Sequence, residues 1–405
     1  MTVQDVFRRA LIVKCLRPDR VLPSLRLFID KIFGSQMLSS KDLQLNKLVT
    51  DEIKSNTPVS FCSVPGLDAS SRVDALAQEL KVSCTSVAIG SIEGYGLADK
   101  AISTASKQGG WVLLKNVHLA PQWLAQLEKK IHNLTPHPTF RLFMTMEINP
   151  KVPASILRMS RIVMFENPPG IKANLQEALG NLQVERVNAQ PIERARLHFM
   201  LGWFHAVVQE RLRYVPLGWT KIYEFNDSDQ KSATDIIDSW IDNVGKERTN
   251  ISPDKIPWDA LRTLLSQSIY GGRIDNEFDQ KLLECFVDHL FNAQIYNSDF
   301  TLADNVTVPE GSVFEHFREW VEKLPDRQPP TWLGLPKNAE KVLLVSQGNA
   351  LLSRVRNMKS LADDDDDEEE AGTQGNEKGA NRNQPLWMRL LLTSVNSWLS
   401  DIQPV

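Results

Sequence analysis

Residues 109–121, GGWVLLKNVHLAP, come closest to a catalytic pattern in this sequence. The apolar run 111–114 follows a pair of glycines, which predicts a buried strand of a parallel sheet. In phosphoryl-transfer modules such a strand ends in acidic residues that hold Mg²⁺ and handle the attacking water. Here Lys115 and Asn116 stand in that place. The sequence therefore predicts the strand without its metal-dependent chemistry.

A phosphate-binding loop would lie between a predicted strand at 59–64 and the helix after it, which Asp68 or Ser70 could cap. Such a loop needs several glycines, a Lys for the β and γ oxygens and a hydroxyl for Mg²⁺. Gly66 and nearby serines are present, but the next Lys is Lys81, a full helix away. Gly66 is therefore a degenerate phosphate-loop position, and a plain strand-to-helix turn is the favoured interpretation.

A second glycine cluster, at Gly90, Gly94 and Gly96, precedes a predicted helix at 97–107. Phosphates can bind to glycine loops, but a cluster this loose is weak evidence for nucleotide binding. We therefore expect a mobile loop at these three glycines.

Histidines and cysteines are the other candidate ligands. His198 and His205 lie two helical turns apart, but further ligands are missing near them, which favours packed or surface histidines over a metal site. The cysteines have neither CxxC nor His spacing, and they stand at positions 15, 62, 84 and 285. They suit small buried residues in a reducing compartment rather than a disulfide or a zinc site.

The elements that must position these residues alternate between strand and helix from residue 56 to residue 170. Strands are predicted at 59–64, 87–89, 111–114, 140–150 and 161–170, and helices lie between them. Pro121 and Pro153 suit the first turns of two of these helices. This alternation is typical of an α/β fold, a parallel sheet with flanking helices.

The rest of the chain is helical in pattern. Helices are predicted at 3–16 and 22–32, and a long helix with one apolar face contains Leu197, Leu201, Phe204, Val208 and Leu212. Asp227 or Ser228 is expected to cap the next helix. A glycine pair within 270–273 separates two more helices, the second starting at Asp275, and a further helix covers 338–357.

Composition excludes several classes of protein. The chain has 405 residues, which suggests two to three domains, with 42% hydrophobic and 24% charged residues. A net charge of −4 gives no reason to expect nucleic acid or an anionic membrane as partner. No apolar run approaches the roughly 18 residues that a spanning helix needs, and no secretory signal opens the sequence.

The C-terminal stretch is of a different kind. An unbroken acidic run at 363–370 continues into Gly-, Asn- and Lys-rich sequence, so disorder is predicted for 363–383. The run lacks the alternating ligands and the glycine of an EF-hand. A last amphipathic helix is predicted at 384–402. Because both ends of the chain fall within helical patterns, we expect a piece of a longer chain.

Several phrases now support a resemblance. TPVSFCSVPGLDAS, WVLLKNVHLAP, FRLFMTMEINPKVP, ENPPGIKANL, ERLRYVPLGWTKIYEF and SIYGGRIDNEFDQKLL occur in this order. Together they resemble the C-terminal part of dynein heavy chains, and MEINPKVP and NISPDKIPW favour the cytoplasmic type. The resemblance covers nearly the whole chain apart from the acidic insert.

The resemblance implies a division of the chain. Residues 1–55 would be a helical linker, 56–170 the large domain of a degenerate sixth AAA+ module, 171–291 its all-α lid, and 292–405 the start of a helical C-terminal domain. It implies an ATP-driven, minus-end-directed microtubule motor as the parent, located in the cytoplasm and on the cytoskeleton. ATP and Mg²⁺ would act in the parent and not in this fragment.

By the same resemblance, Thr145 or Asn149 falls near the place of a polar sensor residue, and Arg158 and Arg161 near that of a trans-acting arginine. We name no catalytic or metal-binding residue, and Gly66 alone as a weak cofactor-binding position. The implied partners are neighbouring AAA+ modules, dynein intermediate and light chains, and microtubules, with no nucleic acid and no membrane insertion.

Three functions remain open at this point. A non-catalytic AAA+ module that closes a motor ring and relays conformation is the first, and an active ATPase module is the second. A free-standing adaptor with an AAA-like fold is the third. The missing Lys and the missing acidic pair favour the first.

Overall fold

The computed structural model describes residues 3–35, 38, 45–63, 67, 69–245, 248–311 and 313–357. The chain divides into two compact units, residues 1–346 and 347–405. The described part of the second unit is the end of helix α15 (Ala339–Arg356) with Asn357. The predicted acidic insert at 363–383 and the last predicted helix lie outside the described residues.

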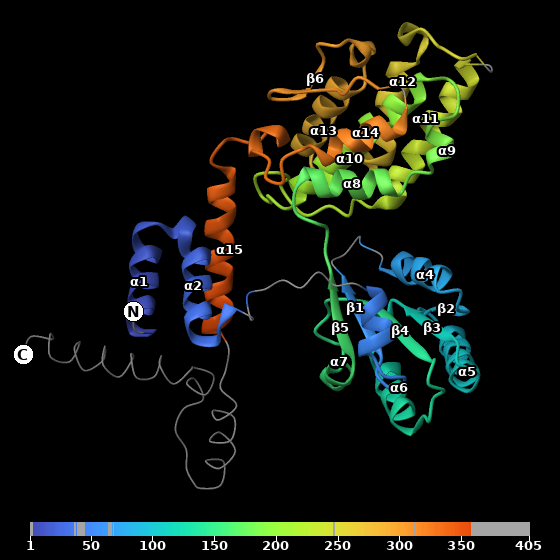
Figure 1. Ribbon diagram of the computed structural model, residues 1–405, viewed down its shortest axis with the longest axis vertical. Helices are drawn as coiled ribbons and strands as arrows, with labels where there is room; N and C mark the ends of the chain where they lie inside the picture. The colour runs from blue at the N-terminus through green and yellow to red at the C-terminus, as the bar shows by residue number, and fades with distance from the viewer. Residues whose placement is uncertain are drawn as a thin grey trace, which may run out of the picture. The chain divides into compact units, whose positions relative to one another are not determined.

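The chain opens with a helical hairpin (Figure 1). Helix α1 (Val3–Leu16) and helix α2 (Val21–Phe33) are joined by a short turn, η1 (Pro18–Arg20), because Pro18 cannot continue α1. The rings of Phe7 and Phe28 hold the two helices together, with centroids 5.7 Å apart. Both helices predicted for this segment are present. A short α3 (Leu45–Lys47) and the π-helical η3 (Leu48–Glu52) follow.

A five-stranded parallel sheet occupies the next part of the chain. Its spatial order is β2-β3-β4-β1-β5, as Figure 1 shows. The strands are β1 (Val59–Ser63), β2 (Cys84–Ala88), β3 (Trp111–Lys115), β4 (Arg141–Glu147) and β5 (Arg161–Phe165). The connecting helices are α4 (Ser70–Glu79), α5 (Ile92–Gln108), η4 (Val117–Leu119), α6 (Pro121–Asn133) and α7 (Ala154–Met159). The predicted α/β fold with flanking helices is confirmed.

Alternate residues of β3 enter two separate cores. Trp111 and Leu113 pack with α4 and η3 on one face of the sheet. Val112 and Leu114 pack with α5, α6 and α7 on the other. A strand covered on both faces has no solvent side, which explains its unbroken apolar sequence.

Helix α5 begins earlier than predicted. Gly94 and Gly96 lie inside it and not in a loop, because the Ser91 hydroxyl caps the helix by accepting a hydrogen bond from the Gly94 amide at 3.3 Å. A Cβ at Gly94 would lie 2.8 Å from the carbonyl oxygen of Ala88. This glycine therefore permits close packing of the helix on the end of β2.

Strand β5 also differs from the prediction, since it ends at Phe165 and not at residue 170. The remaining residues, 166–170, connect the sheet to the helical part. Their two prolines cannot donate hydrogen bonds to a neighbouring strand, which ends the strand pairing.

The second part of the first unit is helical and built around α10 (Glu193–Leu212). Its other helices are α8 (Ile171–Gly180), α9 (Val184–Val187), α11 (Asp227–Gly245), η5 (Pro253–Lys255), α12 (Trp258–Thr263), η6 (Leu264–Ile269), η7 (Gly271–Arg273), α13 (Glu277–Leu290), η8 (Ala293–Tyr296), α14 (Phe314–Glu322) and η9 (Pro330–Leu333). A small antiparallel pair, β6 (Thr301–Ala303) and β7 (Val306–Thr307), lies after η8.

Helix α10 is buried on every side, so the prediction of one apolar face was wrong. The consecutive residues His198, Phe199 and Met200 are all 0% exposed, although successive side chains point about 100° apart around a helix. Neighbouring helices surround α10 and supply polar or charged partners for its buried polar side chains. A sequence in which apolar and polar residues alternate can therefore form a helix that is buried on every side.

The predicted caps of two helices were also displaced. Asn226, and not Asp227 or Ser228, caps α11 by accepting from the amides of Ser228 and Asp229. The second of these helices, predicted to start at Asp275, starts at Glu277, because Asn276 caps α13 by accepting from the amides of Phe278 and Asp279. Asn is at least as good a cap as Asp, so the sequence alone could not decide which of the adjacent residues caps each helix.

One hydrophobic core runs through this helical part, from Ile171 to Ala339. It passes the boundary that we expected at residue 291 without a break, because Ile295, Phe314 and Leu333 belong to it. The sequence beyond 291 gave only weak helical patterns, since much of it folds as short turns and the β6–β7 pair.

Candidate functional site

The carboxyl edge of the sheet carries a pocket where a nucleotide would bind in an active α/β module. Its volume is about 270 Å³, and its walls come from the ends of β1, β3 and β4 and from the start of α4. The lining residues are Ser63, Leu67, Ser70, Lys115, Asn116, Thr145, Met146 and Glu147. The sequence-predicted strand end 115–116 is therefore at the expected position.

Lys115 replaces the acidic group that a metal would need. Its Nζ lies 3.8 Å from the carboxylate of Asp74 on α4, and the two side chains are 31% and 43% exposed. A cation at the end of β3 repels Mg²⁺ rather than coordinating it. Asp74 has no signal in the sequence, because nothing in the order of residues indicates that α4 crosses the end of β3.

Asn116 and Thr145 join β3 to β4 at this edge. Asn116 adopts a left-handed conformation, with φ 57°, and its amide donates to the Thr145 hydroxyl at 3.2 Å. Thr145, one of the two sensor candidates, is 5% exposed and lines the pocket. Asn149, the other, accepts from the Lys151 amide at 2.9 Å in a local turn and does not line it.

His118 and Glu147 make a second connection between the same strands. The Glu147 amide donates to His118 Nδ1 at 3.1 Å, and His118 Nε2 lies 3.9 Å from the Glu147 carboxylate. The His118 side chain is 10% exposed. Glu147 ends β4 and His118 lies three residues after the end of β3, and this position near two strand ends is the signal by which they could have been paired from the sequence.

The remaining candidates lie elsewhere. Gly66 is outside the described residues. Arg161 starts β5 at the amino edge of the sheet, where it lies 3.8 Å from Glu52 with both side chains more than half exposed. Arg158 is in the last turn of α7 and exposed. The pocket thus gathers Lys115, Asn116 and Thr145 but neither arginine.

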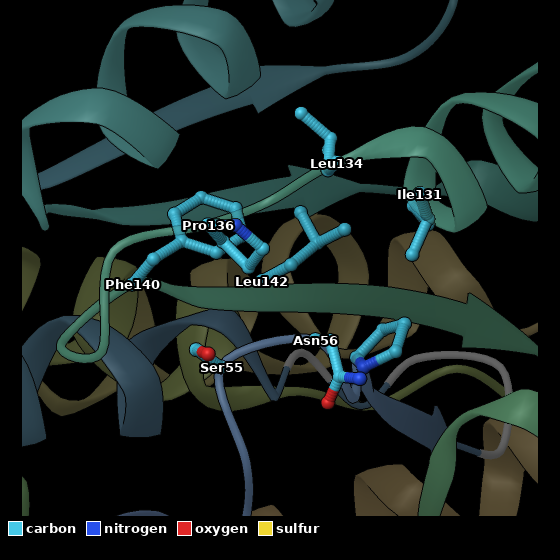
Figure 2. Close-up of a pocket in the computed structure, with 8 residues that line it drawn as sticks. Ser55, Asn56, Ile131, Leu134, Pro136, Phe140 and Leu142 are labelled. Atoms are coloured by element: carbon cyan, nitrogen blue, oxygen red, sulfur yellow. The ribbon is translucent and has the colours of Figure 1, made fainter.

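Figure 2 shows another cavity, at the amino edge of the sheet. It lies between Ser55 and Asn56 before β1 and apolar side chains that include Ile131, Phe140 and Leu142. Its volume is about 10 Å³, enough for one water molecule. This cavity is a small packing defect and not a ligand site.

Both histidines of α10 are buried, in accordance with the packed alternative. His198 Nε2 lies 3.1 Å from Asp238 on α11, which also pairs with Arg194 at 2.7 Å. His205 Nδ1 lies 3.0 Å from the Tyr270 hydroxyl, and burial lowers the pKa of His205 to about 4. Within the described residues, no group of three or more His, Cys, Asp or Glu side chains could hold a metal ion.

All four cysteines are free thiols. Cys62 is buried, but Cys15 and Cys285 are exposed, so the expectation of small buried residues holds only in part. Burial raises the pKa of the Cys84 thiol to about 11, which keeps it protonated and unreactive. Among the described helices, none is both long and apolar enough to cross a membrane.

This arrangement is poorly suited to phosphoryl transfer. The pocket has space for a small anion, yet its one lysine is paired with Asp74, and Glu147 contacts His118. The two acidic side chains, Asp74 and Glu147, do not form the acidic pair that would hold Mg²⁺ and an attacking water. What remains at the edge is a set of contacts that join α4, β3 and β4.

Two dynein families match the chain. Residues 54–164 match the family described as dynein heavy chain region D6 P-loop domain. Residues 194–339 match the family described as dynein heavy chain AAA lid domain. The first match covers the sheet, and the second covers most of the helical core. The second match and the helical core both end at residue 339.

Three similar proteins are named as dynein heavy chains. The chain is 50% identical over 404 residues to the cytoplasmic dynein heavy chain of Drosophila melanogaster, which covers 96% of this chain and 9% of that protein. It is 52% identical over 361 residues to the cytoplasmic dynein heavy chain of Dictyostelium discoideum, covering 89% and 8%. Cytoplasmic dynein 2 heavy chain 1 of Chlamydomonas reinhardtii is 35% identical over 368 residues, covering 88% and 8%.

The chain thus spans less than a tenth of the length of these relatives. Identity at this level over nearly all of the chain, together with a P-loop domain followed by an AAA lid, shows that it belongs to the dynein heavy chain family.

Proposed function

We propose that this stretch is a non-catalytic AAA+ module of a dynein heavy chain, with a structural and conformational-relay role in the motor ring. The observation that carries the proposal is Lys115, which stands at the end of β3 and pairs with Asp74 where a metal-binding acid would be needed. The absence of any Lys between Ser63 and Lys81 supports it. The alternative is an active nucleotide-binding ATPase module.

The parent protein would be an ATP-driven, minus-end-directed microtubule motor of the cytoplasm and cytoskeleton. ATP and Mg²⁺ would act at other modules of that heavy chain. Its partners would be the neighbouring AAA+ modules, intermediate and light chains, and microtubules. The names of the relatives, cytoplasmic dynein heavy chains, support this context.

We also propose a division of the chain. Residues 1–55 lead into the module as a helical linker, and 56–170 form its large domain. The lid starts at 171, and its continuous core supports an end near 339 instead of 291. The start of the C-terminal domain would then follow.

The test is Mg²⁺-dependent ATP hydrolysis by the 405-residue chain, with an intact AAA+ ATPase as positive control. We expect no turnover above a buffer blank. Turnover that Gly66→Val abolishes would establish the alternative, an active ATPase. Nucleotide binding without turnover is compatible with the proposal, because amides at a helix start can hold phosphate without chemistry.

A further inference from the structure

The segment between the sheet and the lid, residues 166–170, has the sequence ENPPG. Figure 1 shows the chain passing from β5 through this segment into α8. Where two domains close around a ligand, the short segment that connects them acts as a hinge and absorbs the backbone change. The bending freedom of this segment therefore determines whether the module can respond to nucleotide at all.

The backbone of this segment is already restricted by its sequence. Pro168 and Pro169 each fix their own φ, and each restricts the residue before it to extended conformations. Gly170 has φ +101°, a conformation that other residues rarely adopt. Three consecutive residues, from Asn167 to Pro169, are thus confined by the prolines before any contact is considered, whereas Gly170 depends on contacts to hold its conformation.

Side chains of the lid then hold the segment from one side. The buried carboxylate of Glu210 on α10 accepts from the Gly170 amide at 2.8 Å and from Asn174 Nδ2 at 3.2 Å. Asn174 Nδ2 also lies 2.8 Å from the carbonyl oxygens of Pro168 and Gly170. Gln209 accepts from Asn167 Nδ2 at 2.6 Å.

A fourth lid residue acts at the next amide along the chain. The Ile171 amide donates to Gln328 Oε1 at 3.1 Å. Gly170 and Ile171 carry the first amides after the prolines, and they open α8, so Glu210 and Gln328 satisfy donors that a helix start leaves unpaired. The charge of Glu210 also favours the positive end of α8.

The sheet holds the other side of the segment. Phe165, the last residue of β5, is in register with Ser63 of β1. Arg72 on α4 lies over the Phe165 ring at 5.5 Å and forms an ion pair with Glu177 on α8. Glu166 is therefore the one residue between the last residue paired in the sheet and the first residue held by the lid.

We propose that Gln209, Glu210 and Gln328 form a clamp that locks the 166–170 segment, so that the sheet and the lid move as one rigid lever without nucleotide. Glu210 is the central positioning residue of this clamp. The inference deepens the proposed relay role and rests on it for its purpose: a module that does not hydrolyse ATP transmits motion best when it does not bend.

Amide hydrogen exchange in the 405-residue chain tests the clamp at Gly170 and Ile171. Glu210→Ala should accelerate exchange of the Gly170 amide by at least about tenfold, because it loses its acceptor. Glu210→Gln should retain most of the protection, since the amide oxygen can still accept from Gly170 and Asn174. Gln328→Ala should expose Ile171 and leave Gly170 protected, which separates the two contacts.

The controls separate the clamp from general destabilisation. Glu319→Ala, on the exposed face of α14, should change neither amide. Amides in the middle of α11 should keep their wild-type rates in every variant. Equal acceleration at α11 and at Gly170 in Glu210→Ala, or unprotected Gly170 in the wild type, would overturn the proposal.

A distance measurement tests rigidity directly. Spin labels at Lys129→Cys on α6 and Ser239→Cys on α11 are placed in a chain that carries Cys15→Ser and Cys285→Ser. We expect one narrow distance distribution that Mg²⁺-ATP does not shift and that Glu210→Ala broadens. If Mg²⁺-ATP shifted the distance between the labels but was not hydrolysed, the clamp would be refuted and the proposed function would stand. Hydrolysis in the parallel assay would refute the proposed function.

Discussion

The carboxyl edge of the sheet and the interior of the lid both contain pairs of opposite charge, but in very different surroundings. At the sheet edge, Lys115 and Asp74 are 31% and 43% exposed and 3.8 Å apart. In the lid, Arg194 and Asp238 are 5% and 9% exposed and 2.7 Å apart. Exposed pairs contribute little to stability, whereas removing one partner of a buried pair is strongly destabilising.

This difference shows where the module depends on particular residues. The pocket lies at the carboxyl edge of the sheet, where ligands bind in open α/β folds, but its contacts are few and open to solvent. The lid instead surrounds a central polar helix with specific partners. Buried Arg211 illustrates this, because it donates to the Gly218 carbonyl at 3.0 Å and stacks on Trp219 at 5.4 Å. We therefore expect large effects in the cores and small ones at the pocket edge.

The largest effect is expected for Leu114→Asp in β3. Leu114 is 0% exposed, so the substitution places an unpaired charge in the core and should lower the free energy of unfolding by about 3–5 kcal/mol. Chemical denaturation of the 405-residue chain measures this. Leu119→Asp is the matched control, because Leu119 is 61% exposed and should cost less than about 0.5 kcal/mol. Equal costs for the two variants would contradict burial of β3 on both faces.

An intermediate effect is expected from pH, through His205 in the lid. Burial lowers its folded-state pKa to about 4 from an ordinary value near 6.5. The unfolded chain therefore binds the proton first, and stability that is fully present above about pH 6.5 should be lost as pH falls towards 4. The loss should amount to about 3 kcal/mol.

Unfolding curves of the wild type and His205→Gln, measured between pH 7 and pH 4, isolate this contribution. Gln can still bond the Tyr270 hydroxyl but does not titrate, so the variant should lose less stability over the window. If both proteins had the same pH dependence, His205 would not be held neutral by burial, and the contrast between lid and pocket edge would weaken.

The smallest effect is expected for Lys115→Ala at the pocket edge. With both partners partly exposed, the variant should lose less than about 1 kcal/mol. A double-mutant cycle with Asp74→Ala should give a coupling energy below about 0.5 kcal/mol. A cost comparable to that of Leu114→Asp would mean that Lys115 has a buried role, and the non-catalytic interpretation of this edge would have to be rebuilt.

Local patterns predicted some elements well. The helix at 3–16 is present with those bounds, since its apolar spacing and Pro18 are local signals. The strand at 111–114 is buried, because an unbroken apolar run has no face for solvent. The start of α5 was misplaced because Gly94 and Gly96 suggested a loop, although they lie inside the helix. The caps at Asn226 and Asn276 were displaced because neighbouring residues offered equivalent capping side chains.

The candidate site was predictable in position but not in its contacts. The order of residues placed Lys115 and Asn116 at a strand end, and strand ends of a parallel sheet share one edge. It could not pair Lys115 with Asp74 or Asn116 with Thr145, because those contacts depend on how α4 and β4 lie beside β3.

By itself, the sequence determined the α/β alternation, the loss of the phosphate-loop Lys and the loss of the acidic pair, because these are properties of local residue order. Only the tertiary structure decided that α10 is central and that Glu210 and Gln328 hold the segment after β5. The physical reason is distance along the chain: a buried carboxylate 40 residues from the amide that it accepts from has no local signature. Its partner becomes visible only when two helices are packed together.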